Sequence, residues 1–62
     1  MAQTPVKAAE AIKSARLAAG LTQADAANLI DRTDRWWRMV EAGQIRMPPT
    51  LWELWLLKSK RS

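Results

Sequence analysis

Residues 21–43 have the sequence LTQADAANLIDRTDRWWRMVEAG, and this stretch decides the fold because it encodes two short helices in close succession. Thr22 is followed three residues later by Asp25, a capping-box arrangement in which Asp takes the place of the usual Glu or Gln. Apolar residues then recur at helical spacing. The first part of the stretch therefore predicts a helix over 23–30.

The second helix of the stretch begins only a few residues later. Thr33 is a suitable N-cap, and Asp34 places a negative charge in the first turn, where the helix dipole favours it. Gly43 is a suitable terminator, so we expect this helix over 34–42. The short connection at residues 31–32 is typical of a helix-turn-helix unit rather than of an antiparallel helical hairpin with a longer loop.

Start and stop signals also predict a helix before this unit. Thr4 and Pro5 fit an N-cap and a first helical position, and Gly20 fits the end, which gives a helix over 5–19. Within it apolar side chains share one face, which is small and which we expect to be buried. These residues are Ala8, Ile12, Ala15 and Ala19.

A last helix follows the unit. Prolines 48 and 49 should not lie inside a helix, whereas Thr50 and Glu53 make a full capping box that opens a helix over 51–58. A short basic tail occupies 58–62. No strand pattern competes, so residues 1–62 are predicted to form a single all-α domain, a compact bundle of four helices or five.

The composition is that of an ordinary globular domain with a basic surface. The 62 residues are 48% hydrophobic and 26% charged, with a formal net charge of +4. The positive charge makes a polyanion the first partner to consider. The charge alone is equally compatible with a basic surface that binds no acidic partner. Cysteine and histidine are absent, which removes disulfides, the usual zinc ligands and the commonest general base.

These absences argue against an enzyme, a cofactor or a metal site. The serines at 14, 59 and 62 have no histidine to activate them. The apolar segment 51–57 is far shorter than the roughly 18 residues of a membrane span. Charged residues interrupt the N-terminal region, so a secretory signal is not expected, and the predicted location is the cytoplasm.

The four tryptophans divide into two pairs. Trp37 and Trp55 fall on predicted inward faces and should form the core together with Val40, Leu51 and Leu54. Trp36 is adjacent to Trp37 on the same helix, so the two side chains cannot both point inward, and we expect Trp36 to be partly exposed. Trp36 could then pack under the loop, contact DNA or meet a second subunit. Leu29, Trp52 and the last helix with its tail are candidates for a subunit interface.

Several residues fall in the register of a known family. They are Arg16, the run Leu21-Thr22-Gln23, Ala27, Thr33, Trp37, Val40, Glu41 and Gly43. Over roughly residues 12–56 the chain resembles the lambda-repressor/Cro-like helix-turn-helix proteins of the xenobiotic-response-element type, and in particular small regulators carried by phages and mobile elements. It departs from their pattern at Asp31-Arg32, where they commonly have Gly and an apolar residue, and at Ala26, where they have Leu. Asp tolerates the left-handed conformation, and Trp37 can supply the missing volume.

The resemblance implies a transcriptional repressor or autoregulator that binds a palindromic operator in double-stranded DNA as a homodimer, associated with the nucleoid. The side chains that would contact bases are Asp34, Arg35, Trp36 and Met39. Arg35 could donate two hydrogen bonds to guanine, Met39 could pack on a thymine methyl, and Asp34 could accept from cytosine or orient a neighbouring arginine.

The resemblance also assigns supporting roles. The residues that would contact phosphates are Gln23, Arg32, Thr33, Arg38, Gln44 and Arg46. Arg16 and Glu41 would form an ion pair between helices. An alternative remains open, in which the fold serves as a protein-binding module, such as an inhibitor, an antitoxin or an anti-repressor, without binding DNA. No small-molecule substrate and no membrane are expected in either case.

Overall fold

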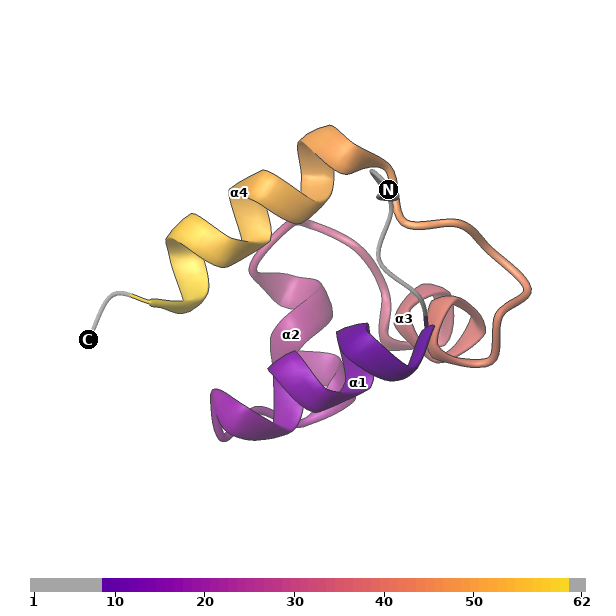
Figure 1. Cartoon of the computed structure of the whole chain (residues 1–62), viewed down its shortest axis with the longest axis horizontal. Helices are drawn as coiled ribbons and strands as arrows, with labels where there is room; N and C mark the ends of the chain where they lie inside the picture. Colours follow the sequence, from indigo (N-terminus) through magenta and orange to yellow (C-terminus); the bar gives the residue numbers. More distant parts are fainter. Residues whose placement is uncertain (1–8, 61–62) are drawn as a thin grey trace, which may run out of the picture.

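A computed structural model describes residues 9–60 of the chain, and within that range all regular structure is helical, which confirms the predicted all-α class. The elements are α1 (Ala9–Ala18), α2 (Gln23–Asn28), α3 (Asp34–Glu41) and α4 (Pro49–Ser59). Figure 1 shows α1, α2 and α3 grouped together, with α4 lying across one side of the group. No helix in the described range is long and apolar enough to cross a membrane.

The N-caps of α2 and α3 are those that the sequence predicts. Thr22 Oγ1 accepts a hydrogen bond from the Asp25 amide, and Thr33 Oγ1 accepts one from the Trp36 amide, both at 3.0 Å. Each cap satisfies one of the amides that a helix start leaves without a partner. These two local hydrogen bonds fix where the two helices of the central unit begin.

The first three helices end in the same way, each with one residue of positive φ. Gly20 has φ 75°, Asp31 has φ 59° and Gly43 has φ 84°. In each case the amide of the residue that follows the positive-φ residue donates to the carbonyl five residues earlier. For example, Arg32 N donates to Ala27 O at 2.9 Å. This is the Schellman arrangement, and Asp31 adopts the left-handed conformation that is expected of it. The helix predicted over 23–30 therefore ends early, at Asn28, and its last residues tighten into the turn.

Two other helix boundaries differ from the expectation. The helix predicted over 5–19 ends at Ala18, and Ala19 is exposed rather than buried. Its expected start at Thr4 and Pro5 lies outside the described residues. The helix predicted over 34–42 ends at Glu41, with Ala42 as its C-cap.

The start of α4 is a correction to the sequence prediction. Pro48 is the N-cap and Pro49 is the first helical residue, so the helix begins two residues before the expected Leu51. Pro49 is tolerated there because the first amide of a helix needs no partner and because its fixed φ suits the helix. No side-chain hydrogen bond caps this helix, so Thr50 and Glu53 do not form the predicted capping box.

Tryptophans fill the space that two alanines leave. Ala26 and Ala27 of α2 are fully buried, and so are Trp37 and Trp55, as expected. The ring centroids of Trp37 and Trp55 are 5.5 Å apart, and Trp55 Nε1 donates to Ala26 O at 3.1 Å. The large rings of α3 and α4 therefore close the core over the small residues of α2.

Two predictions for α4 were wrong. Trp52 is not a surface residue but a core residue, and its ring stacks on that of Trp55 with centroids 5.2 Å apart. Leu54, expected in the core, is exposed. Stacking a second indole on Trp55 covers more apolar area than burying Leu54 would, and this orients the helix so that Leu54 and Leu57 lie on its outer side.

Candidate nucleic-acid interface

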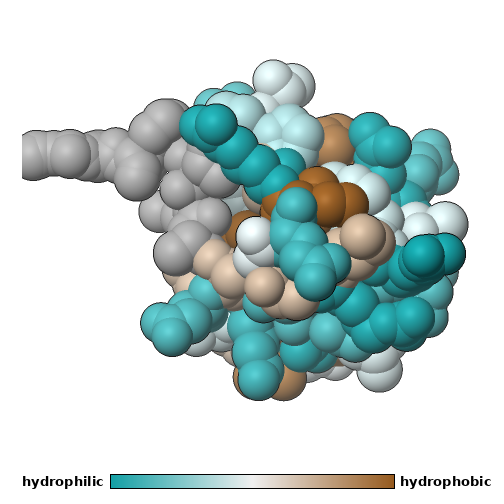
Figure 2. Space-filling view, turned by 90° about the vertical axis from the view of Figure 1, so that its right-hand side faces the viewer, coloured by the Kyte–Doolittle hydropathy of each residue, from teal (hydrophilic) through white to brown (hydrophobic). Residues whose placement is uncertain are grey.

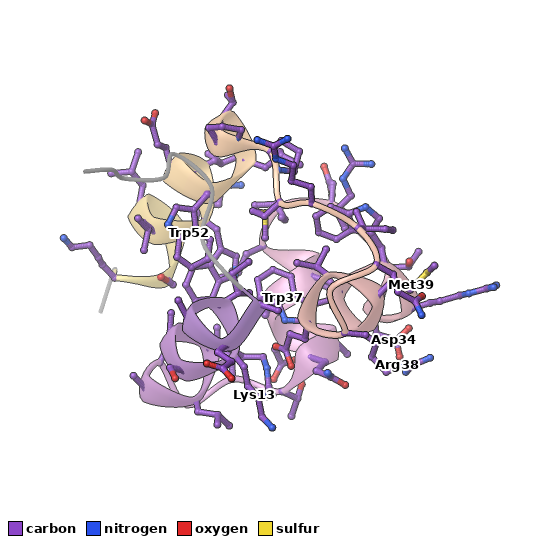
Figure 3. The ribbon with its side chains drawn as sticks, turned by 45° about the vertical axis from the view of Figure 1, so that its right-hand side comes forward. Lys13, Asp34, Trp37, Arg38, Met39 and Trp52 are labelled. Atoms are coloured by element: carbon purple, nitrogen blue, oxygen red, sulfur yellow. The ribbon has the colours of Figure 1, made fainter. Side chains whose placement is uncertain are left out.

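Helix α3 is anchored by one side and presents the other to solvent. Trp37 and Val40 are buried against the rest of the molecule. In Figure 3, Asp34, Arg38 and Met39 lie on the far side of α3 from Trp37 and Trp52, at the edge of the molecule. Arg35 is also exposed, and Met39 is half-buried. Three of the four side chains that the sequence predicts to contact bases, Asp34, Arg35 and Met39, thus lie on the outward side of α3, whereas Trp36 packs against the core.

An ion pair lies on this surface. Arg38 Nη1 donates to Asp34 Oδ2 at 3.1 Å, one helical turn apart, and about half of each side chain is exposed. The Asp34 carboxylate therefore orients Arg38 along the helix, one of the roles that the sequence suggests for it. A pair as exposed as this is easily exchanged for another partner, such as a phosphate.

Trp36 lies at the start of α3 beside the turn. It is half-buried, as expected, and the guanidinium of Arg32 lies over its ring at 5.2 Å from the centroid. This distance is within the range of a cation–π contact. The contact joins the turn to α3, and the planar guanidinium of Arg32 keeps its outward hydrogen-bond donors.

The loop after α3 places two more polar side chains beside the C-terminal end of this helix. The amides of Gln44 and Ile45 donate to Met39 O at 2.9 and 3.3 Å, which keeps the loop against the end of α3. Gln44 and Arg46 are exposed. Figure 2, which faces the side of the molecule where α3 lies, shows hydrophilic side chains around a narrow apolar strip.

Behind this surface a single carboxylate joins three helices. Arg16 Nε of α1 donates to Glu41 Oε2 at 2.6 Å, and Gln23 Nε2 of α2 donates to Oε1 at 3.1 Å. Trp37 Nε1 of α3 is a further donor to the same group. Arg16 also donates to Leu21 O at 3.0 Å. The structure thus has the Arg16–Glu41 pair and adds two donors that the sequence did not reveal.

The surroundings of Glu41 favour its charged form. Burial by itself would raise the pKa of this carboxyl, but hydrogen bonds from Arg16, Trp37 and Gln23, together with the charge of Arg16, outweigh it and hold the pKa below the ordinary value of 4.5. Glu41 therefore stays ionised at neutral pH and keeps Arg16 neutralised.

Besides Arg32 and Arg38, two further side chains expected to contact phosphates have structural partners. Gln23 is half-buried with its amide on Glu41, so only its second N–H and its oxygen remain for a ligand. Thr33 uses its oxygen as the α3 cap, and its hydroxyl proton remains available. Both side chains are held in place before any ligand arrives.

One exposed residue of the outward surface was missed. Ala42 follows Arg35 by seven residues, or about two helical turns, so it shares the same side of the helix. The helical period could have indicated it. Its small side chain leaves room for close approach of a ligand at the end of α3.

One comparison with known proteins is consistent with this arrangement of helices. A family model described as a helix-turn-helix domain matches residues 8–55. None of the curated proteins is similar enough to the chain to count as a match.

Proposed function

We propose that this chain, which belongs to the helix-turn-helix domain family, binds double-stranded DNA sequence-specifically and occupies an operator as a transcriptional repressor or autoregulator. One observation carries the proposal. The outward side of α3 presents Arg35, Arg38 and Met39, while its inward side is fixed by the core. A helix held in this way is suited to the major groove, which is about 12 Å wide.

Specific contacts would come from the first half of α3. Among residues 9–60 no acidic side chain pairs with Arg35, so its guanidinium can donate to the O6 and N7 atoms of guanine. Asp34 supports Arg38 and can accept from a cytosine amino group, and Trp36 can contact a base at the edge of the site.

Phosphate contacts would surround this helix. Arg32 precedes α3, Arg46 and Gln44 follow it, and all three are exposed. Gln23 and Thr33 can add hydrogen bonds from atoms that their structural partners leave available. Such contacts fix the orientation of the protein on the duplex without selecting a sequence.

A homodimer on a palindromic operator would supply the affinity that one small domain lacks. Two-fold dimers place their helices in half-sites about one helical turn apart, 34–36 Å. Trp52 is buried and is no longer an interface candidate, whereas Leu54 and Leu57 on the outer side of α4 are exposed. These leucines are the surface through which we propose that two copies associate.

The decisive experiment is selection of bound duplexes from a random-sequence library, followed by two matched arginine variants. We expect a two-fold symmetric consensus. Arg35→Ala should relax the preference at one base pair of each half-site and weaken binding by about 1–3 kcal/mol per half-site. Arg46→Ala should weaken all sequences alike and flatten the dependence on salt. Equal effects of the two substitutions on every sequence would contradict the proposed division of roles.

A second candidate function is a protein-binding module that keeps the fold without binding DNA. Leu17 and Leu57 are exposed, at 57% and 71% of their full accessibility, and in this second candidate they would contact a protein partner other than a copy of the chain. The two functions differ in a simple measurement. A chain that binds no random duplex DNA at low salt, where phosphate contacts are strongest, and that binds a protein partner tightly belongs to the second class.

A further inference from the structure

A cavity of about 310 Å³ lies between the start of α1, the end of α3 and the loop that follows α3. Figure 1 shows these three segments next to one another. We infer that this cavity binds an amphiphilic carboxylate, a small molecule with an apolar body and one carboxylate group, which competes with a DNA phosphate for the Arg46 guanidinium. The competition, unlike the cavity itself, rests on the proposed DNA-binding function.

The inner walls of the cavity are apolar. Ile12 of α1, Val40 of α3 and Met47 of the loop line it, and each is no more than 2% exposed. Protein interiors are close-packed, so apolar walls that face a cavity forfeit contacts that an apolar ligand would restore. The volume is at the lower end of the range of ligand sites, roughly 300–1,000 Å³, so the ligand is a small one.

The charge at the cavity is positive. Among residues 9–60, Arg46 is the one charged residue that lines it, and no acidic side chain in that range pairs with Arg46. Gln44 lines the cavity as well, and both side chains are exposed. A guanidinium offers paired hydrogen-bond donors in the geometry of a carboxylate, and the Gln44 amide can donate to the same group. Charge complementarity therefore selects an anionic head on an apolar body.

The loop that carries Arg46 is anchored on both sides of this residue. The amides of Gln44 and Ile45 donate to Met39 O, and the side chain of Met47 is buried. From this fixed backbone the long side chain of Arg46 can contact a ligand in the cavity or a phosphate outside it, but not both at once. Because coupling between two binding sites is reciprocal, DNA should weaken ligand binding by the same factor as the ligand weakens DNA binding.

The experiment uses the full chain and three probes, which are octanoate, octanol and acetate. Octanol has the apolar chain without the charge, and acetate has the charge without the chain. Titrations followed by NMR or calorimetry should show that octanoate binds most tightly, and each methylene removed from it should weaken binding by about fourfold. Octanol that binds as tightly as octanoate would overturn the inference. Absence of octanoate binding, which is also expected if residues 1–8 fill the cavity, would overturn it too.

Three variants test whether the cavity and Arg46 are responsible. Arg46→Ala should weaken octanoate binding by about tenfold or more, because the carboxylate loses a charged donor. Lys13→Ala removes the same charge from an exposed position of α1 that does not line the cavity, so it should leave octanoate binding unchanged. Ala9→Leu should fill the cavity and abolish octanoate binding without lowering Tm. Octanoate binding that is equal in all three variants would overturn the inference.

The effect on DNA is measured with random duplexes at constant ionic strength. Saturating octanoate should weaken DNA binding to the level of Arg46→Ala, for every sequence alike, whereas acetate should not. The Ala9→Leu variant keeps Arg46, so it should bind DNA and be insensitive to octanoate. Octanoate that binds without changing the DNA affinity would overturn the competition. A chain that binds octanoate but no DNA would overturn the proposed function and leave the carboxylate site standing, whereas DNA binding without octanoate binding would overturn only this inference.

Discussion

Replacing Glu41 with alanine removes the acceptor on which α1, α2 and α3 converge. The Arg16 and Glu41 side chains are only 10% and 7% exposed, so the substitution leaves a buried guanidinium without its counter-charge. Removing one partner of a buried pair costs about 3–5 kcal/mol. Arg16 keeps its hydrogen bond to Leu21 O, which places the expected loss near the lower end, at about 3 kcal/mol.

This loss is large for so small a domain. At roughly 0.05–0.15 kcal/mol per residue, a chain of 62 residues has an unfolding free energy of roughly 3–9 kcal/mol. Each 1 kcal/mol lowers Tm by roughly 4–8 °C at this size. Glu41→Ala should therefore lower Tm by roughly 12–24 °C or leave the chain partly unfolded at room temperature.

The assay is thermal and urea unfolding followed by circular dichroism, with Glu53→Ala as the matched control. Glu53 is exposed on α4, and its loss removes the same charge from the chain. We expect the control to change stability by no more than about 0.5 kcal/mol. The reasoning is refuted when Glu41→Ala unfolds at the same temperature as Glu53→Ala.

The same carboxylate gives a pH dependence with a definite sign. Because the pKa of Glu41 is lowered in the folded state from 4.5, its ionised form stabilises the fold above that pH, and the stability is lost as the pH falls below it. Unfolding free energy measured from pH 7 to pH 3 should therefore fall at the acid end of the range. Glu41→Gln should be less stable than the wild type at pH 7 and should show a smaller acid loss. An acid loss of the same size in Glu41→Gln would assign it to other carboxyls.

Three further outcomes are expected. Trp55→Phe should cost about 1–2 kcal/mol in urea unfolding, because Ala26 O loses the indole donor within the core; an unchanged midpoint would contradict this. Asp31→Val should cost about 1–2 kcal/mol and Asp31→Gly little, because only the valine is strained at φ 59°; equal stability of the two variants would show that the turn relaxes. Leu57→Lys should weaken self-association in sedimentation and leave Tm of the dilute protein unchanged, whereas unaltered self-association would move the proposed interface elsewhere.

Signals that act within a few residues were sufficient to place the central unit. The caps at Thr22 and Thr33 are hydrogen bonds to amides three residues away, and the left-handed residues at 20, 31 and 43 end helices by local geometry. Such signals do not depend on what packs around them. The fold class followed from the same local information, whereas the residues expected on the outward side of α3 came from the resemblance.

The orientation of α4 could not be predicted because its sequence does not define a face. Residues 49–59 are apolar at most positions, so helical periodicity allows Trp52 or Leu54 to point inward. The choice depends on the shape of the cavity that α2 leaves, which is a tertiary property. At the start of the helix two local signals competed, and the fixed φ of Pro49 prevailed over the capping box.

The Arg16–Glu41 pair and the cap of α3 could be predicted residue by residue, but the hydrogen-bond network around Glu41 could not. Resemblance indicated Arg16 and Glu41, and the caps indicated Thr33. The donation from Gln23 to Glu41 depends on how α2 crosses α3, which no sequence spacing specifies. This contact changes the expected role of Gln23. Because one amide N–H of Gln23 is bonded to Glu41, only its second N–H and its oxygen remain to contact a phosphate.

The core and the proposed DNA-contacting surface share α3, so they cannot be varied independently. Its eight residues include inward side chains, such as Trp37, and outward side chains, such as Arg35 and Met39. Trp37 fills the space over the α2 alanines and also donates to Glu41, so its replacement by an aliphatic residue would lose both volume and a hydrogen bond. Either loss lets α3 rotate or shift. A small rotation of α3 displaces the core atoms near its axis only slightly, but it displaces the tip of a side chain as long as that of Arg35 by a larger distance. In the proposed complex this displacement matters, because the guanidinium would have to meet two guanine acceptors at once. If α3 contacts bases as proposed, the selectivity of the chain would therefore depend on Trp37 behind the helix as well as on Arg35 in front of it.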